Sequence, residues 1–210
     1  CSYDRYTTDE QPGVSRVCLG GTYPSKHIDE YFQRMHPNAV RLFKEIGIEN
    51  GVLMLSAFYE NGEFYVYDTG FRLQGEAPHL LMRAIHGFDQ RKMLIRFALT
   101  GSEGDADLKS EDDARLRGKW AATLWFLLKE GKIAKIQGFD QWEQDERVVD
   151  NIQRLYEGDT VLPEWIGNEK QVLARMYIVC NSKLELADTL KYYMSTVKVL
   201  DENGSNMLLK

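Results

Sequence analysis

The feature that most constrains the fold of this chain is a polar turn between two runs of β-forming residues. The runs cover residues 52–59 and 64–67, and the turn between them reads Glu60-Asn61-Gly62-Glu63. Asn and Gly readily adopt the positive φ angles that a tight turn requires. The flanking runs are rich in aliphatic and aromatic residues. Residues 52–67 are therefore predicted to form a β-hairpin.

A helix is expected immediately before this hairpin. Alternating residues 14–19 predict a strand that ends at Gly20-Gly21, and Ser25 is suited to cap the helix that follows. Apolar residues then recur every three or four positions over residues 28–46, which predicts one buried stripe on the helix. Pro37 would kink or break the helix.

Beyond the hairpin, residues 77–99 predict two helical stretches divided at Gly87, with His79 and His86 as solvated side chains. The segment that follows is rich in charged residues and glycine, which is typical of a solvated linker or lid. We therefore expect three parts: residues 1–105, an acidic linker or lid at 106–117, and a β-rich part at 118–210 with one late helix.

The last part is expected to begin with β structure. Residues 121–128 and 132–137 predict a second hairpin around Glu130-Gly131, and further strands are expected at 148–155, 173–179 and 197–200. Ser182 can cap a helix that runs to about Thr196, with Leu184, Leu186 and Ala187 among the side chains facing inward.

Composition narrows the classes of protein to which the chain can belong. A net charge of −6 without a cluster of Lys and Arg argues against nucleic-acid partners. No apolar run is long enough to cross a membrane and no signal peptide is visible, so we expect no membrane partner. Three scattered cysteines fit a reducing compartment better than a disulfide framework, so a cytoplasmic protein is expected.

The residues from Gly51 to Glu76 resemble those of the ATP-grasp enzymes, biotin carboxylase and the large chain of carbamoyl-phosphate synthase in particular. In that family a long helix precedes a Gly-led strand bearing one acid. A turn that often reads Glu-Asn-Gly follows, and the second strand ends acid-x-Asn-x-Arg. Here Asp68 matches the second acid and Arg72 the arginine. Two positions depart from the pattern, because Ser56 stands at the first acid and Gly70 at the asparagine.

The resemblance implies a site for ATP and Mg²⁺, with Mn²⁺ as an alternative metal. Asp68 would be the metal ligand, Ser56 and Gly70 would stand at the other ligand positions, and Arg72 would supply fixed positive charge. Further residues implied to act at this site are Gln74 and Glu76, toward the substrate, and Arg16, near the phosphates or the acyl substrate.

Strand geometry sets a condition on this site. Ser56 and Asp68 share a face of the hairpin if its loop has an odd number of residues, such as Asn61-Gly62-Glu63. A strict two-residue Asn61-Gly62 turn would put them on opposite faces. A serine hydroxyl carries no charge, so the site lacks one negative charge unless Glu63, Glu76 or a water compensates.

The fold implied by the resemblance is α+β. It comprises the carboxy-terminal half of an ATP-grasp domain, with an antiparallel sheet and helices on one face, followed by a small mixed α/β domain. Residues 1–105 would be part of the second ATP-grasp subdomain. The glycine-rich loop, lysines and adenine-binding hinge of the family are not recognisable, so the N-terminal half of the same protein would be missing. This fragment alone is expected to be inactive.

The activity implied by the resemblance is the joining of a small-molecule carboxylate to an amine or a thiol through an acyl phosphate. A degenerate, non-catalytic module kept for subunit contact or regulation is the alternative, favoured by Ser56 and Gly70. An enzyme that joins amino-acid or sugar-acid units into a polymer fits the sequence equally well. The sequence also leaves open whether the protein forms a homodimer.

Overall fold

The computed structural model describes residues 1–7, 17–102, 104 and 112–209. Its centre is a five-stranded antiparallel sheet whose strands do not follow the order of the chain. From one edge to the other they are β1 (Asp4–Tyr6), β2 (Gly20–Tyr23), β5 (Trp120–Leu127), β9 (Val172–Cys180) and β7 (Val148–Gln153). Strands from both sides of the expected linker thus share one sheet. The division at 106–117 stays a prediction, and residues 105–111 lie outside those described.

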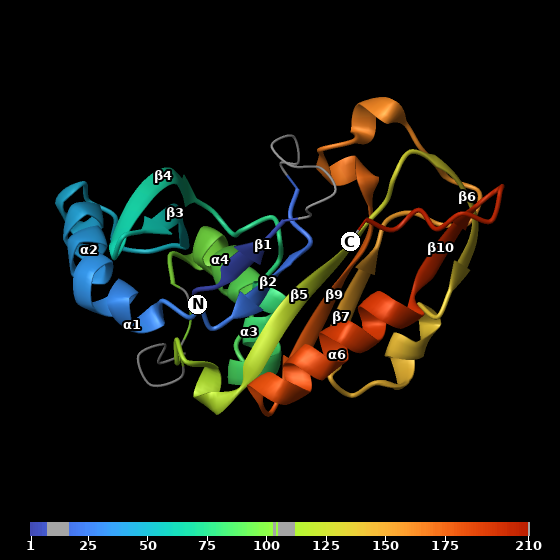
Figure 1. Ribbon diagram of the computed structural model, residues 1–210. Helices are drawn as coiled ribbons and strands as arrows, with labels where there is room; N and C mark the ends of the chain where they lie inside the picture. Colours follow the sequence, from blue (N-terminus) through green and yellow to red (C-terminus); the bar gives the residue numbers. More distant parts are fainter. Residues whose placement is uncertain (8–16, 103, 105–111, 210) are drawn as a thin grey trace.

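Helices cover both faces of this sheet (Figure 1). α6 (Lys183–Thr196) packs on one face, where Leu186 and Tyr193 join the largest hydrophobic core. α3 (His79–His86) packs on the other face, where its buried leucines meet Ala121 and Tyr177. α4 (Gln90–Thr100) follows and has no buried residue.

The helices and the hairpin that precede α3 in the chain lie at one end of the molecule (Figure 1). α1 (Ile28–Glu30) continues through a π-helical turn (Tyr31–Met35) into α2 (His36–Glu45). Pro37 lies in the first turn of α2, directly after this irregular turn, and the expected kink stays a prediction. The hairpin consists of β3 (Leu53–Glu60) and β4 (Glu63–Phe71).

The opposite end of the molecule carries a smaller three-stranded sheet (Figure 1). Its strands, in spatial order, are β10 (Lys198–Asp201), β6 (Gly131–Gln137) and β8 (Thr160–Val161). Short 3-10 turns connect the elements of the second half of the chain, at Leu116–Gly118, Asp140–Gln144, Pro163–Trp165 and Glu169–Gln171. In the described part of the chain, no helix has both the length and the apolar character needed to cross a membrane.

The sequence predicted several of these elements correctly. The first hairpin, the two helices divided at Gly87 and the late helix are present, and the α+β class is confirmed. Gly87 ends α3 with a φ of 87°. Ser182 caps α6 as expected, because its Oγ accepts a hydrogen bond of 3.1 Å from the backbone N–H of Glu185.

Two expectations about strands were wrong. Gly20 begins β2 instead of ending a strand. Glycine is required at this position because an added Cβ would clash with the carbonyl oxygen of Thr123 on the neighbouring β5. The described residues 17–19 are not a strand. Residues 121–128 and 132–137 do not form a hairpin, because β2 and β9 occupy both edges of β5 while β6 pairs with β8 and β10.

Expectations about burial also needed correction. Leu184 is 72% exposed and Ala187 is exposed, while Thr189 and Tyr193 face inward instead. His79 and His86 were expected to be solvated, yet both are buried where α3 packs on the sheet. Burial lowers the pKa of both histidines, which favours their neutral forms. Ser25 does not cap the first helix, which begins only at Ile28.

Candidate functional site

The turn of the β3–β4 hairpin contains only two residues. Asn61 and Gly62 have φ angles of 52° and 83°, and Glu60 pairs directly with Glu63. Positive φ at both central residues is the signature of a type I′ turn, whose twist matches that of the strands. The three-residue loop considered above is therefore absent, and a regular ladder from this turn would separate Ser56 and Asp68.

A β-bulge in β4 reverses that consequence. Ala57 pairs with Val66, but the next residue, Ser56, pairs with Asp68, so Tyr67 is an extra residue in β4. Residues directly opposite each other in an antiparallel pair project their side chains to the same face. The bulge therefore brings Ser56 and Asp68 together on one face of the hairpin.

The Asp68 carboxylate is exposed, and no described residue forms a hydrogen bond or ion pair with it. Magnesium commonly takes one or two carboxylates and completes its shell with waters and substrate phosphates. Asp68, with the Ser56 hydroxyl opposite, fits that requirement for a single ion. Groups of three His, Cys, Asp or Glu side chains suited to a metal do not occur in the described residues.

Arg72 follows the end of β4 and is exposed. Its guanidinium donates a hydrogen bond of 3.1 Å to the carbonyl of Leu73. Gly70, at the asparagine position of the family pattern, pairs with Met54 and follows Asp68 by two residues on the same strand face. A Cβ at Gly70 would lie 3.3 Å from the Met54 side chain and 3.5 Å from that of Arg72, so a larger residue would meet only flexible side chains.

Gln74 and Glu76 lie in a different environment. Glu76 is buried, with only 8% of its surface exposed, and its carboxylate accepts hydrogen bonds from Tyr3 and, at 3.2 Å, from Gln74. Arg5 forms an ion pair with the same carboxylate at 3.0 Å. Burial and the Glu76 charge raise the pKa of Tyr3. Although burial acts to lower the pKa of Arg5, the Glu76 charge raises it overall.

The backbone of the same loop is attached to β9. Arg175 donates a hydrogen bond of 2.7 Å to the carbonyl of Gly75, and the Tyr177 hydroxyl donates one of 3.0 Å to the carbonyl of Glu76. Burial raises the pKa of Tyr177 to about 12, so this hydroxyl stays a donor at neutral pH. The loop that follows Arg72 is therefore fixed on one side by Arg5 of β1 and by Tyr3 just before it, and on the other side by side chains of β9.

The structure thus brings together only part of the expected set. Ser56, Asp68, Gly70 and Arg72 lie along one hairpin, whereas Gln74 and Glu76 belong to the buried network with β1. Glu63 was considered as a replacement for the missing acid, but it pairs with Arg34 at 2.9 Å beside the turn. Arg16 lies outside the described residues. Tyr3 and Arg5 carry no motif that could have identified them.

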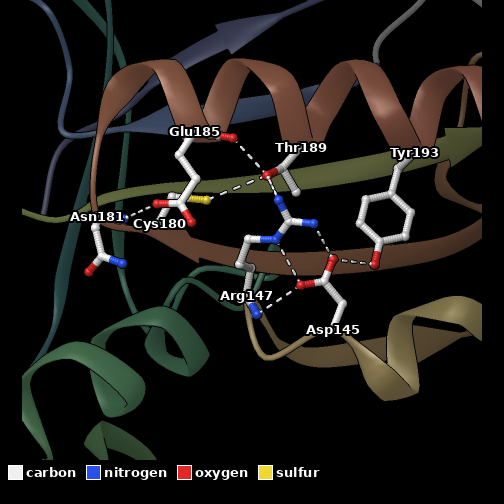
Figure 2. Close-up of polar contacts among 7 residues, drawn as sticks. All are labelled: Asp145, Arg147, Cys180, Asn181, Glu185, Thr189 and Tyr193. Atoms are coloured by element: carbon white, nitrogen blue, oxygen red, sulfur yellow. Dashed lines mark hydrogen bonds and ion pairs between the residues drawn. The ribbon is translucent and has the colours of Figure 1, made fainter.

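A second polar cluster lies between α6 and the start of β7 (Figure 2). Arg147 binds both carboxylate oxygens of Asp145 at 2.8 Å and donates a third hydrogen bond of 2.8 Å to Thr189. The Tyr193 hydroxyl donates to the same carboxylate at 2.9 Å. The hydrogen bonds from Arg147 lower the pKa of Asp145, and the carboxylate raises the pKa of Arg147.

Two clefts of the described residues adjoin this cluster and not the hairpin. They have volumes of about 470 Å³ and 380 Å³, and Glu146 and Arg147 line both. Three of the charged side chains that face the clefts are already bound, because Asp145 and Thr189 bind Arg147 and Glu185 accepts a hydrogen bond of 2.7 Å from the backbone N–H of Asn181. We therefore interpret the cluster as a structural connection that holds α6 on the sheet, and the hairpin as the candidate site.

Comparison with known proteins gives a consistent fold. No protein-family model matches the sequence, and no curated protein does. Among solved structures, the L-amino acid ligase from Bacillus licheniformis superimposes with a TM-score of 0.74 at 16% identity, over 92% of this chain and 46% of the ligase. Phosphoribosylglycinamide synthetase from Anaerococcus prevotii also gives 0.74, at 14% identity, over 96% of this chain and 48% of the synthetase.

A third similar structure is the biotin carboxylase domain of a single-chain bacterial carboxylase, with a TM-score of 0.61 and 16% identity over 87% of this chain and 41% of that one. All three are ATP-grasp enzymes, and the chain spans less than half the length of each. Identities this low show the shared fold alone. The chain therefore has the α+β fold of the ATP-grasp enzymes, over about half their length, as the residues of the hairpin predicted.

Proposed function

We propose that this chain forms one wall of the nucleotide and metal site of an ATP-dependent ligase. The ligase would join a small-molecule carboxylate to an amine or a thiol through an acyl phosphate, and residues preceding Cys1 in the intact protein would supply the rest of the site. The fold supports this proposal, as do the names of two similar structures, an L-amino acid ligase and a phosphoribosylglycinamide synthetase.

The observation that carries the proposal is the bulge at Tyr67. A two-residue turn alone would separate Ser56 from Asp68, and the extra residue returns them to one face. Bulges are over-represented next to active sites, where they re-aim a side chain. On that face the Asp68 carboxylate is exposed and has no described partner, so its oxygens are available to bind a metal ion.

Each residue of the hairpin would have a distinct role. Asp68 would bind Mg²⁺, and the Ser56 hydroxyl opposite would bind the ion directly or through a water. Arg72 would carry fixed positive charge beside the phosphates, where negative charge develops during phosphoryl transfer. Bound ATP would supply the phosphoryl group that activates the carboxylate. The loop at residues 74–76, fixed by β1 and β9, would hold Arg72 at a constant distance from Asp68.

Phosphate release from ATP by the intact protein tests the proposal, with mixtures of carboxylates and amines as substrates. Asp68→Asn keeps the shape of the side chain and removes the charge, so we expect the rate to fall at least about tenfold. Glu143→Gln, a matched change at an exposed acid outside the hairpin, should leave the rate unchanged. Substrate-dependent release that persists undiminished in Asp68→Asn would overturn the proposal.

A degenerate, non-catalytic module is the second candidate, favoured by Ser56 and Gly70 at two ligand positions of the family pattern. In that case no substrate mixture releases phosphate. The double variant Ser56→Glu, Gly70→Asn should then gain Mg²⁺-dependent ATP binding, because the Gly70 site can accept a side chain by small shifts of Met54 and Arg72. An active wild-type enzyme excludes this candidate.

A further inference from the structure

A histidine at the end of α3 is enclosed without a hydrogen-bond partner. His86 is the last residue of α3, and none of its side chain is exposed. Its ring stacks on that of Phe88, with 5.6 Å between the ring centroids. Neither ring nitrogen forms a hydrogen bond within the described part of the chain. Burial penalises a charged imidazole, so this enclosed position favours the neutral form of the ring.

The charged groups that face His86 do not cancel this effect of burial. The Asp112 carboxylate lies 3.6 Å from Nδ1 of His86, which is too far for a hydrogen bond. Asp112 and Asp113 favour the imidazolium, whereas Arg117 and the amino group of Cys1 in this 210-residue chain oppose it. Burial is the largest effect, and it lowers the pKa of His86 below the ordinary value of 6.5.

The turn at residues 112–118, which leads into β5, is held in place by its packing on α3. Leu116 is fully buried in a hydrophobic core that also contains Leu80 and Leu81 of α3. Leu116 and Arg117 have φ angles of 57° and 52°, in the left-handed region that residues with a side chain rarely adopt. Such a backbone persists where the surrounding structure holds it. A change that weakens the packing on α3 is therefore expected to release the turn.

The same turn also contacts the helical segment that precedes the hairpin. Arg115 forms an ion pair with Asp29 of α1, and its guanidinium lies 6.0 Å from the centre of the Phe32 ring. The turn therefore connects α1 to α3 and to the large sheet. Its release would remove one of the contacts that attach α1 to the rest of the molecule.

We propose that protonation of His86 releases the turn at residues 112–118 from α3, which makes this junction sensitive to acid. A proton on the enclosed ring would create a charge without a hydrogen-bond acceptor, and opening of the turn would expose that charge to water. The closed turn is fully favoured above the ordinary histidine pKa of 6.5 and is lost progressively as the pH falls below it. This inference does not depend on the proposed function.

Hydrogen exchange of the turn in the intact protein measures this release. The backbone amides of residues 115–119 all donate hydrogen bonds within the turn, two of them to the Asp113 carboxylate. After correction for intrinsic exchange, their protection should fall at least about threefold between about pH 7.5 and about pH 5. The hydrogen bond from the backbone N–H of Arg115 lowers the pKa of Asp113, so this carboxylate stays ionised over that range. Protection that is unchanged or greater in acid would overturn the proposal.

Two matched variants test whether His86 is the group that takes up the proton. His86→Phe places a ring that stays neutral at every pH in the same enclosed position, so the loss of protection in acid should disappear. His79→Phe makes the same change at another buried histidine of α3, and the turn should still lose its protection as in the wild type. An undiminished loss in His86→Phe would assign the effect to another group and overturn the proposal.

A third variant separates release of the turn from its opposite, a tightening by an ion pair between His86 and Asp112. The Asp112 side chain is 43% exposed, so Asp112→Asn should fold even if His86→Phe does not. Removing this charge makes the closed state bind the proton more weakly, so the loss of protection in acid should be at least as large as in the wild type. A smaller loss would show that Asp112 holds the protonated turn closed and would overturn the proposal.

Discussion

Asp145 and Arg147 connect α6 to the large sheet through a set of charge-assisted hydrogen bonds (Figure 2). The Asp145 side chain is 13% exposed, and Arg147, Tyr193 and the backbone all bind its carboxylate. Losing the charge would leave the Arg147 guanidinium without its anion in a half-buried position. At the scale of single residues, this carboxylate is the one from which we expect the clearest dependence of stability on pH.

Asp145→Asn should lower the free energy of unfolding at pH 7 by about 2 kcal/mol. The folded-state pKa of Asp145 lies below its ordinary value of 3.8, so its contribution is present above that pH and is lost as pH falls through the folded pKa. The difference between wild type and variant should therefore shrink below about pH 4. Urea unfolding at pH 7 and at pH 3 measures both values.

The matched control is Glu202→Gln. Glu202 pairs with Lys132 at 2.8 Å, but their side chains are 63% and 50% exposed. Exposed pairs contribute little to stability, so this variant should unfold like the wild type at both pH values. An equal loss in the two variants would mean that burial of Asp145 does not matter.

At the scale of elements, local sequence patterns correctly predicted the features that depend on residues adjacent in the sequence. They failed for the features that depend on pairing between distant strands. The Asn61-Gly62 turn and the Ser182 cap follow from residue types alone, so they were predictable. The bulge at Tyr67 was not, because no residue type marks it and it exists only in the pairing of two strands. The prediction that Gly20 ends a strand was wrong for the same reason, because the close approach of β5 requires a glycine there.

The residues of the candidate site also divide into those that a local sequence pattern identifies and those that only long-range contacts bring together. Asp68 and Arg72 could be identified from a short motif. Tyr3 and Arg5, which bind Glu76, are more than seventy positions away from Glu76 in the sequence. Long-range contacts of this kind leave no local pattern. The burial of His79 and His86 was missed because it depends on which face of α3 meets the sheet.

Paired cysteines test the register that the bulge creates. In a Cys1→Ser background, Ser56→Cys with Asp68→Cys should oxidise to an intrachain disulfide, because directly opposite residues have Cα atoms at a bridging distance. Leu55→Cys with Asp68→Cys is the control, since a hairpin without the bulge would pair those two positions. Disulfide formation only in the control pair would show that the bulge is absent.

At the scale of the whole molecule, the chain has the fold of about half of an ATP-grasp enzyme and one end of it lacks a core. The large sheet, α3 and α6 account for the buried interior. The hairpin and α2 extend from this body at one end (Figure 1). The proposed metal-binding face therefore lies on an element that has no buried core of its own among the described residues.

The measurement that tests the central claim most directly is a calorimetric titration of the intact protein with ATP, with and without Mg²⁺. We predict that Mg²⁺ strengthens ATP binding in the wild type and that Asp68→Asn removes this dependence on Mg²⁺, weakening Mg-ATP binding at least about tenfold. Glu143→Gln should bind as the wild type does. Absence of binding in the wild type, or binding with the same Mg²⁺ dependence in Asp68→Asn, would contradict the assignment of the β3–β4 hairpin as the metal and nucleotide site.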